Sequence, residues 1–187
     1  RQGHAGRQCR RGGGAQVNTK RLFFGVELSG EARAAVRAAA EKMRLEKGKL
    51  TDADNYHITL AFLGQTDERA VFELLRLGAL CWRAPFALTL SGRIDAFKGG
   101  SVIWAGLDKS DALFDTQARL QAILRENGFP IEEGVYTPHI TVARSARAVL
   151  PYPSVERVSF GVRAMTLFES TREGGRLVYK PLGRRPQ

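Results

Sequence analysis

Tyr56-His57-Ile58-Thr59-Leu60-Ala61 and Pro138-His139-Ile140-Thr141-Val142-Ala143 are near copies of each other, and their histidines lie 82 residues apart. An internal duplication explains such a repeat economically. The apolar residues alternate with His and Thr as in a strand, so the histidine and the threonine of each copy share one face. The sequence therefore predicts two strands that each present one imidazole beside one hydroxyl.

The chain around the first copy has the pattern of strand, helix and strand. Residues 21–28 are aromatic and β-branched, and Ser29 is a suitable cap for a helix with an apolar face. A polar loop is expected over residues 48–55, followed by a strand over residues 56–63 that stops at Gly64. Asp67 then caps a second helix that reaches about Leu80.

The chain around the second copy repeats this order. The expected elements are a hairpin of residues 86–94 and 101–107, a helix that starts at Asp111 and has Gly128 in the C′ position, a strand over 139–143, and two strands at about 155–168 and 176–179. The fold class predicted is α+β, with the elements of the chain arranged in two successive rounds.

The formal net charge of +10 favours phosphate-rich partners without defining any chemistry. Residues 1–16 contain four arginines and no acid, and without them the net charge falls to +6. Because this stretch is rich in Gly and lacks apolar periodicity, we expect residues 1–18 to be a disordered basic arm or a non-native leader. An RNA-gripping arm is the alternative. Residues 19–187 are expected to form a single domain.

Two cysteines, Cys9 and Cys81, form no disulfide framework and no Cys-x-x-Cys pair. No apolar run approaches the roughly 18 residues that span a bilayer. We therefore expect a cytoplasmic protein that has no membrane partner. We also expect it to be a monomer.

Two facing imidazoles can divide the work of phosphoryl transfer. One removes a proton from the nucleophile while the other protonates the departing oxygen, and the threonine hydroxyls can donate hydrogen bonds to phosphate oxygens. This chemistry needs no cofactor. A zinc site would require three or four ligands at short spacings, and neither His-Glu-x-x-His nor His-x-x-Glu-His occurs in the chain. We expect no metal.

These motifs resemble the 2H phosphoesterases, and within them the bacterial and archaeal RNA 2′,3′-cyclic phosphodiesterases once described as 2′-5′ RNA ligases. The resemblance covers most of residues 20–182. It rests on the two motifs with their flanks and on the stretches 21–24, 55–64, 102–106, 128–130, 137–144, 167–170 and 179–182.

The resemblance implies a bilobal, duplicated fold with two curved antiparallel sheets and flanking helices around a central groove. It also implies hydrolysis of an RNA terminal 2′,3′-cyclic phosphate, or of a small cyclic nucleotide, to a 2′-phosphate. By resemblance His57 is the proton donor and His139 the proton acceptor, while Thr59, Thr141 and Arg144 bind the phosphate. Simple alternation places Arg144 opposite His139, so its role requires the strand to end or twist there.

Recognition of the nucleotide gives a weaker signal. Trp104 and Tyr136 are candidates for stacking on a base, and Phe97 and Lys98 lie in a Gly-containing loop that could grip an RNA end. Two alternatives to the hydrolase stay open at this stage. One is an RNA-end binding module without turnover, and the other is the same site acting on 2′-5′ linkages or in reversible 2′-5′ RNA ligation.

Overall fold

The computed structural model describes residues 18–132 and 134–185, in which three helices flank a large antiparallel sheet. The helices are α1 (Gly30–Glu41), α2 (Val71–Cys81) and α3 (Asp111–Glu126). The strands are β1 (Thr19–Glu27), β2 (Leu45–Leu50), β3 (His57–Asp67), β4 (Phe86–Ala96), β5 (Val102–Leu107), β6 (His139–Ala148), β7 (Ser159–Val162), β8 (Met165–Glu173) and β9 (Arg176–Arg185). The α+β prediction is confirmed.

The strands form two lobes that meet in the middle of the sheet. Their order is β7-β4-β5-β6-β3-β1-β8-β9, and β2 pairs with β6 outside this path. The lobes join where β3 lies against β6, through the residue pair Ile58 and Ile140. Both isoleucines are fully buried. The two histidine motifs thus lie on adjacent central strands.

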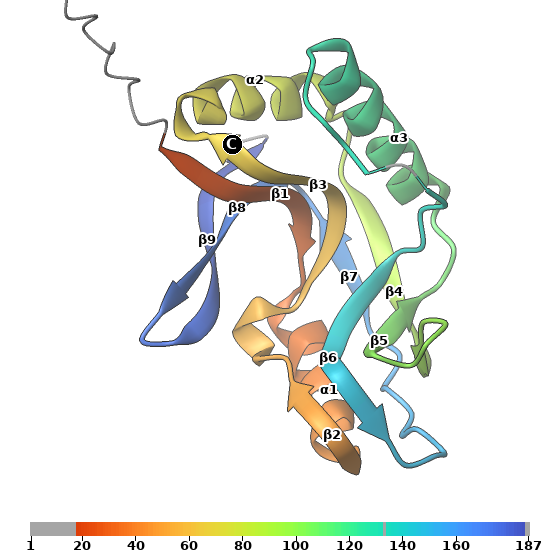
Figure 1. The fold of residues 1–187 in the computed structure, drawn as a ribbon. Coiled ribbons are helices and arrows are strands. Elements are labelled where there is room, and N and C mark those ends of the chain that lie inside the picture. Colours follow the sequence, from red (N-terminus) through yellow and green to blue (C-terminus); the bar gives the residue numbers. More distant parts are fainter. Residues whose placement is uncertain (1–17, 133, 186–187) are drawn as a thin grey trace, which may run out of the picture.

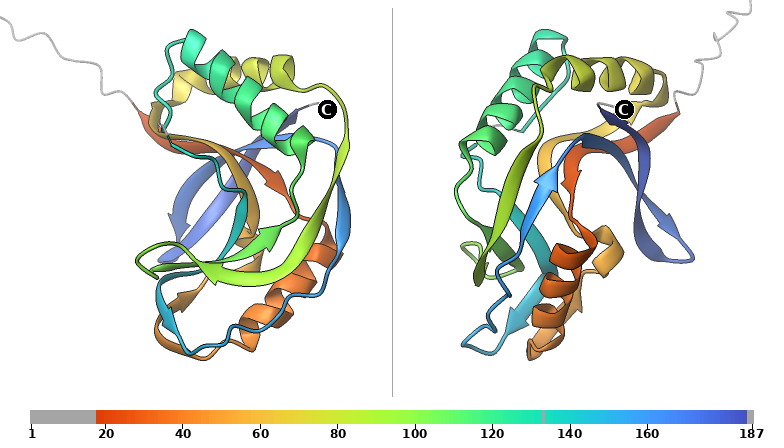
Figure 2. Two further views of the ribbon diagram at one scale, coloured as in Figure 1. Left: turned by 90° about the vertical axis from the view of Figure 1, so that its right-hand side faces the viewer. Right: turned by 180° about the vertical axis from the view of Figure 1, so that it is seen from behind.

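The duplication predicted from the motifs is visible in the order of the elements. One round runs from β1 through α1 to β3, and the other from β5 through α3 to β6, with antiparallel pairing of β1 with β3 and of β5 with β6. Each helix contacts the histidine strand of the other round, since α1 packs near β6 and α3 near β3. Helices α2 and α3 lie together at one end of the molecule and α1 lies at the other (Figures 1 and 2).

Local sequence explains most of these elements. The Ser29 hydroxyl accepts a hydrogen bond from the Ala32 amide and so caps α1, and the apolar face of this helix is buried. Helix α3 begins after Ser110 and ends before Gly128, whose φ of +78° is the conformation that glycine adopts most easily. The helix predictions are confirmed at both places.

Both histidine strands contain a β-bulge at the same position of the motif. In β3, Ala61 pairs with Phe24 and Thr59 with Gly25, which leaves Leu60 as the extra residue. In β6, the corresponding extra residue is Val142. A bulge shifts the alternation of side chains by one residue. Residues beyond the bulge therefore face the opposite way from the simple alternating pattern.

Several boundaries differ from the sequence predictions, and among them β6 extends past residue 143 to Ala148 and β9 past residue 179 to Arg185. Residues 48–50 belong to strand β2 instead of a loop, and their exposed side chains gave no apolar signal. Strand β3 continues through Gly64 to Asp67, which caps a 3₁₀ turn ahead of α2. The run 155–168 contains β7 and the start of β8, separated by Arg163 and Ala164. Residues 1–17 of the predicted arm of residues 1–18 lie outside the described residues, and Asn18 donates a hydrogen bond to Glu68.

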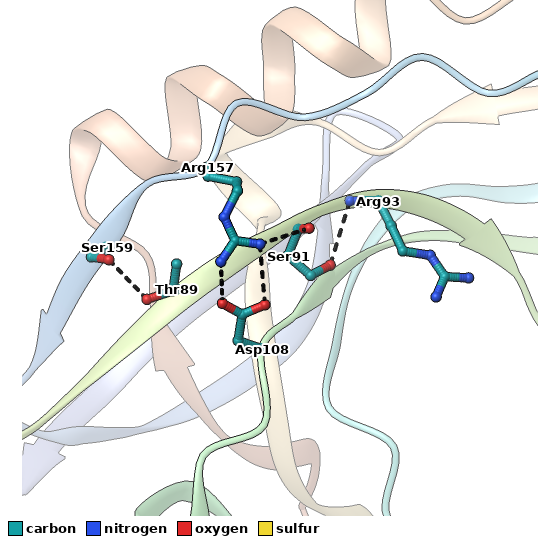
Figure 3. Close-up of polar contacts among 6 residues, drawn as sticks. All are labelled: Thr89, Ser91, Arg93, Asp108, Arg157 and Ser159. Atoms are coloured by element: carbon teal, nitrogen blue, oxygen red, sulfur yellow. Dashed lines mark hydrogen bonds and ion pairs between the residues drawn. The ribbon is translucent and has the colours of Figure 1, made fainter.

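Polar contacts fix the outer edge of the second lobe (Figure 3). The Arg157 guanidinium, in the segment before β7, pairs with Asp108 and donates to the Ser91 carbonyl at 3.1 Å. The Thr89 and Ser159 hydroxyls lie 2.8 Å apart between β4 and β7. These contacts anchor β4, which is the hairpin partner of β5.

Among the described residues, no helix combines the length and the apolar character that crossing a membrane requires.

Candidate active site

The end of β3 holds His57 in a fixed orientation. Its Nδ1 lies 2.7 Å from the Asn55 carbonyl oxygen, and its Nε2 lies 3.0 Å from the Thr59 hydroxyl. Aromatic rings pack around the imidazole, with the Phe23 centroid at 4.8 Å and the Tyr179 ring edge-on at 4.9 Å. Because a carbonyl oxygen only accepts hydrogen bonds, Nδ1 carries the hydrogen.

The end of β6 holds His139 in the same way. Its Nδ1 donates to the Thr137 carbonyl oxygen at 2.8 Å, again two residues before the histidine, and its ring packs edge-on against Phe97 at 4.8 Å. In both histidines the neutral imidazole therefore keeps Nε2 without a hydrogen, available as a proton acceptor.

Both histidines line one open pocket of about 480 Å³, which we call the central pocket. The side chains around it are mostly polar or aromatic. The lining residues are Arg21, Phe23, His57, Thr59, Phe62, Glu132, His139, Arg144, Ser170, Arg172, Leu177 and Tyr179. Two imidazoles and three guanidinium groups among the lining residues form a site suited to an anion.

Of the five residues predicted to act on phosphate, four line the central pocket. Thr141 is the fifth; it is buried and, in the part of the chain that the structure describes, does not reach the pocket wall. Arg144 Nη2 donates to the Thr141 hydroxyl at 3.4 Å. The geometry thus gives Thr141 a contact that orients Arg144.

The bulge in β6 resolves the orientation of Arg144. Trp104 pairs with Thr141 and Ile103 with Ala143, so Val142 is extra and the alternation shifts beyond it. Val142 and Ala143 are both buried, whereas Arg144 is exposed and lines the pocket with His139. By simple alternation Arg144 would lie on the opposite face of the strand from His139. Because the bulge shifts the alternation by one residue, Arg144 lies on the same face as His139.

Burial favours the neutral form of both imidazoles. Burial lowers the pKa of His57 to about 4, against the opposing effect of the Asn55 carbonyl, and Arg144 and His139 lower it further. Burial and Arg144 also lower the pKa of His139, while the Thr137 carbonyl raises it. An anionic phosphate between these rings would favour the protonated forms and raise both values.

The first lobe carries a different side chain where the second carries Arg144. Phe62 follows His57 by five residues, as Arg144 follows His139, and the Arg21 guanidinium lies over the Phe62 ring at 4.9 Å from its centroid. The sequence prediction omitted Arg21, Phe62 and Arg172. Aligning the two copies beyond the motif would have identified Phe62, but nothing local indicates Arg172.

The two aromatic candidates occupy different places. Tyr136 lines a side hollow of about 250 Å³ next to the central pocket, and its hydroxyl donates to the Thr59 carbonyl at 3.0 Å. Trp104 lies behind Phe97, at 5.5 Å between ring centroids, and lines a separate hollow. The Phe97 ring thus contacts both Trp104 and His139. Within residues 18–132 and 134–185, no group of three or more His, Cys, Asp or Glu side chains could hold a metal ion.

The fold and the central pocket define a phosphate-handling site built around paired histidines, and comparison with known proteins gives the family. The model of the 2′-5′ RNA ligase superfamily matches residues 31–173. The chain belongs to this superfamily, which confirms the family expected from the motifs.

Several relatives carry one enzyme name. RNA 2′,3′-cyclic phosphodiesterase of Escherichia coli is 31% identical over 88% of this chain and 95% of its own length. The Thermus thermophilus enzyme of the same name is 32% identical over 76% of this chain and 75% of its own.

A solved structure agrees with the fold. The crystal structure of Escherichia coli LigT complexed with 3′-AMP has a TM-score of 0.81 and 29% identity, and the match covers 89% of this chain and 97% of that one. The bilobal fold implied by the resemblance is therefore confirmed.

Proposed function

We propose that this enzyme is an RNA 2′,3′-cyclic phosphodiesterase that uses two histidines and no metal. The observation that carries the proposal is the convergence of His57, His139 and Arg144 on one pocket. The enzyme names of the relatives support the substrate class. The proposed substrates are RNA 3′ ends with a 2′,3′-cyclic phosphate and small cyclic nucleotides.

The reaction needs one proton acceptor and one proton donor. His139 Nε2 takes a proton from water, the water oxygen bonds to phosphorus, and the bond from phosphorus to the 3′ oxygen breaks. Protonated His57 gives its Nε2 hydrogen to that oxygen, so the product is a 2′-phosphate with a free 3′ hydroxyl. This assignment of proton donor and proton acceptor is the one that the family resemblance implies.

Charge builds up on the phosphate oxygens in the transition state. Arg144 and the Thr59 hydroxyl border the pocket beside the imidazoles and can hold this charge, and Thr141 orients Arg144. Tyr136 and Phe97 line the side hollow and suit the base of the terminal nucleotide. We assign Trp104 the role of supporting Phe97 from behind.

The test is hydrolysis of a short RNA ending in a 2′,3′-cyclic phosphate, in excess EDTA, with identification of the product isomer. The expected result is a 2′-phosphate from the wild type and a rate loss of about 10²–10⁴-fold in His57→Ala and in His139→Ala. Turnover lost in EDTA and restored by a divalent metal would contradict the metal-free mechanism. RNA binding without turnover in all three proteins would indicate an RNA-end binding module.

We also propose that the enzyme acts as a monomer in the cytoplasm. Both histidines and Arg144 of the central pocket come from the same chain, and Cys81 is a buried free thiol whose pKa burial raises to about 11. Sedimentation at the enzyme concentration of the assay checks the monomer, and a dimer at that concentration would contradict it.

A further inference from the structure

A second and larger depression adjoins the central pocket. It has a volume of about 760 Å³, and we call it the basic groove. It lies between strand β2, the middle of β6 and the turn from β8 to β9. The groove shares Arg144, Arg172 and Leu177 with the central pocket, so the two are continuous.

Five cationic side chains line the basic groove: Lys47, Lys49, Arg144, Arg172 and Arg176. One carboxylate joins them, that of Asp52, and it accepts a hydrogen bond from the Asp54 amide. The side hollow on the other side of the pocket has the opposite character. Within the part of the chain that the structure describes, the residues lining this hollow include Glu132 and no lysine or arginine. A phosphate backbone that leaves the central pocket is therefore attracted toward the basic groove.

These five cations are not neutralised by the protein. Within residues 18–132 and 134–185, none of them has a carboxylate within 4.0 Å, whereas eleven other cations of the chain form ion pairs. Moreover, β2 pairs with β6 so that Lys49 lies opposite Arg144. Like charges directly opposite on neighbouring strands are destabilising. A bound anion would relieve this repulsion.

Glycine fixes one wall of the groove. Lys47 and Lys49 flank Gly48, whose φ is +90° and where a Cβ atom would lie 2.5 Å from the Ala146 Cα atom. Only glycine lets β2 approach β6 this closely with both lysines lining the groove. The facing wall is the β8–β9 hairpin, which projects at one side of the molecule (Figure 1).

We propose that the basic groove is the track for the RNA strand on the 5′ side of the cyclic phosphate, with Lys47, Lys49, Arg172 and Arg176 contacting successive backbone phosphates. This inference rests on the proposed function. It predicts that the enzyme distinguishes an oligonucleotide from a mononucleotide by the groove alone. A mononucleotide carries no upstream phosphate and occupies only the central pocket and the side hollow.

The experiment compares two substrates, a short RNA ending in a 2′,3′-cyclic phosphate and 2′,3′-cyclic AMP, with wild type and the double variant Lys49→Gln/Arg176→Gln. For the RNA we expect kcat/KM of the variant to be about tenfold lower than that of the wild type at low salt. We also expect the slope of log kcat/KM against log salt concentration to become shallower by about 1.4, because two phosphate contacts are lost. For cyclic AMP we expect kcat/KM to stay within roughly twofold, since both side chains lie outside the central pocket.

The matched control is Arg83→Gln/Arg125→Gln, which removes the same charge from exposed positions after α2 and at the end of α3. Selective loss on the RNA in the groove variant supports the track. Equal loss in the control would overturn it in favour of overall charge. Equal loss on both substrates, or no loss on either, would also overturn it.

Failure of the proposed function gives a different result. If the wild type hydrolyses neither substrate, the phosphodiesterase assignment fails, and the track is tested by binding instead. Fluorescence anisotropy with a labelled RNA ending in a 2′-phosphate is then expected to show weaker binding by the groove variant than by wild type and control. Equal binding by all three proteins would overturn the proposal that the basic groove binds the RNA strand.

Discussion

At the scale of single residues, the two histidines share a backbone contact but differ in their surroundings. Each donates from Nδ1 to the carbonyl two residues before it. Phe23 and Tyr179 pack around His57, whereas Phe97 packs edge-on against His139. The deeper burial of His57 accounts for the larger lowering of its pKa. This difference makes the direction of proton transfer testable.

The first prediction concerns the leaving group. A cyclic phosphate with sulfur in place of the 3′ bridging oxygen releases a thiolate, which needs no proton donor. We expect the loss in His57→Ala to shrink by about tenfold or more on this substrate, while the loss in His139→Ala persists. Single-turnover rates on both substrates measure the effect. Rescue of His139→Ala instead would reverse the roles, and rescue of neither would contradict proton donation to the 3′ oxygen.

The second prediction concerns pH. The sequence alone predicts a bell-shaped profile with limbs on either side of about 6.5, the ordinary histidine value. Because burial lowers the pKa of both histidines in the free enzyme, we expect the maximum of kcat/KM below pH 6.5. The maximum of kcat should lie higher, since the bound anion raises both values. A profile that is flat between pH 5 and 9 would argue against two-histidine catalysis.

At the scale of elements, the bulges decide which side chains reach the pocket. Leu60 and Val142 are the extra residues of β3 and β6, at the same motif position. The face reversal beyond them brings Phe62 and Arg144 into the central pocket. The same backbone device in both lobes thus presents an aromatic ring in one and a cation in the other.

The third prediction tests the orientation of Arg144. Replacing Arg144 by Ala should lower kcat/KM about 10²-fold, since it removes a donor to the charged phosphate oxygens. Arg147→Ala is the matched control on the same strand, because Arg147 is exposed, pairs with Glu46 and does not line the central pocket. Its kcat/KM should stay within roughly twofold. Equal losses in the two variants would contradict a specific role for Arg144.

At the scale of the whole molecule, both lobes contribute to one hydrophobic core. The buried cluster runs from Leu22 and Phe24 of the first lobe to Leu90 and Ile103 of the second. Helix α1 packs near β6, and α3 near β3, so each round of elements supports the other. We infer that residues 19–187 form one domain in which the lobes do not separate.

The fourth prediction is that the lobes unfold together. Urea unfolding followed by tryptophan fluorescence, which reports on Trp82 and Trp104, should have the same midpoint as loss of hydrogen-exchange protection in β1. Leu120→Ala, a fully buried position of α3, should lower the free energy of unfolding by about 2–5 kcal/mol according to both probes. A shift of the tryptophan midpoint alone would indicate lobes that unfold separately.

The sequence by itself determined the duplicated motifs, their strands and most helix ends. Apolar periodicity and caps such as Ser29 and Gly128 act within a few residues, so they can be recognised from the amino-acid sequence. The same locality explains why His57, Thr59 and His139 lie on the pocket wall, since each belongs to a motif strand. Arg144 reaches the pocket only through the bulge in β6.

Only the tertiary structure decided the bulges, the strand β2 and the basic groove. Strand β2 buries little of its surface and forms because its backbone pairs with β6, about a hundred residues away, so its sequence carries no apolar pattern. The lysine and arginine side chains that line the groove come from three segments that are far apart in the chain. Hydrogen-bond register between distant strands sets these features, and register depends on the partner strand as much as on the strand itself.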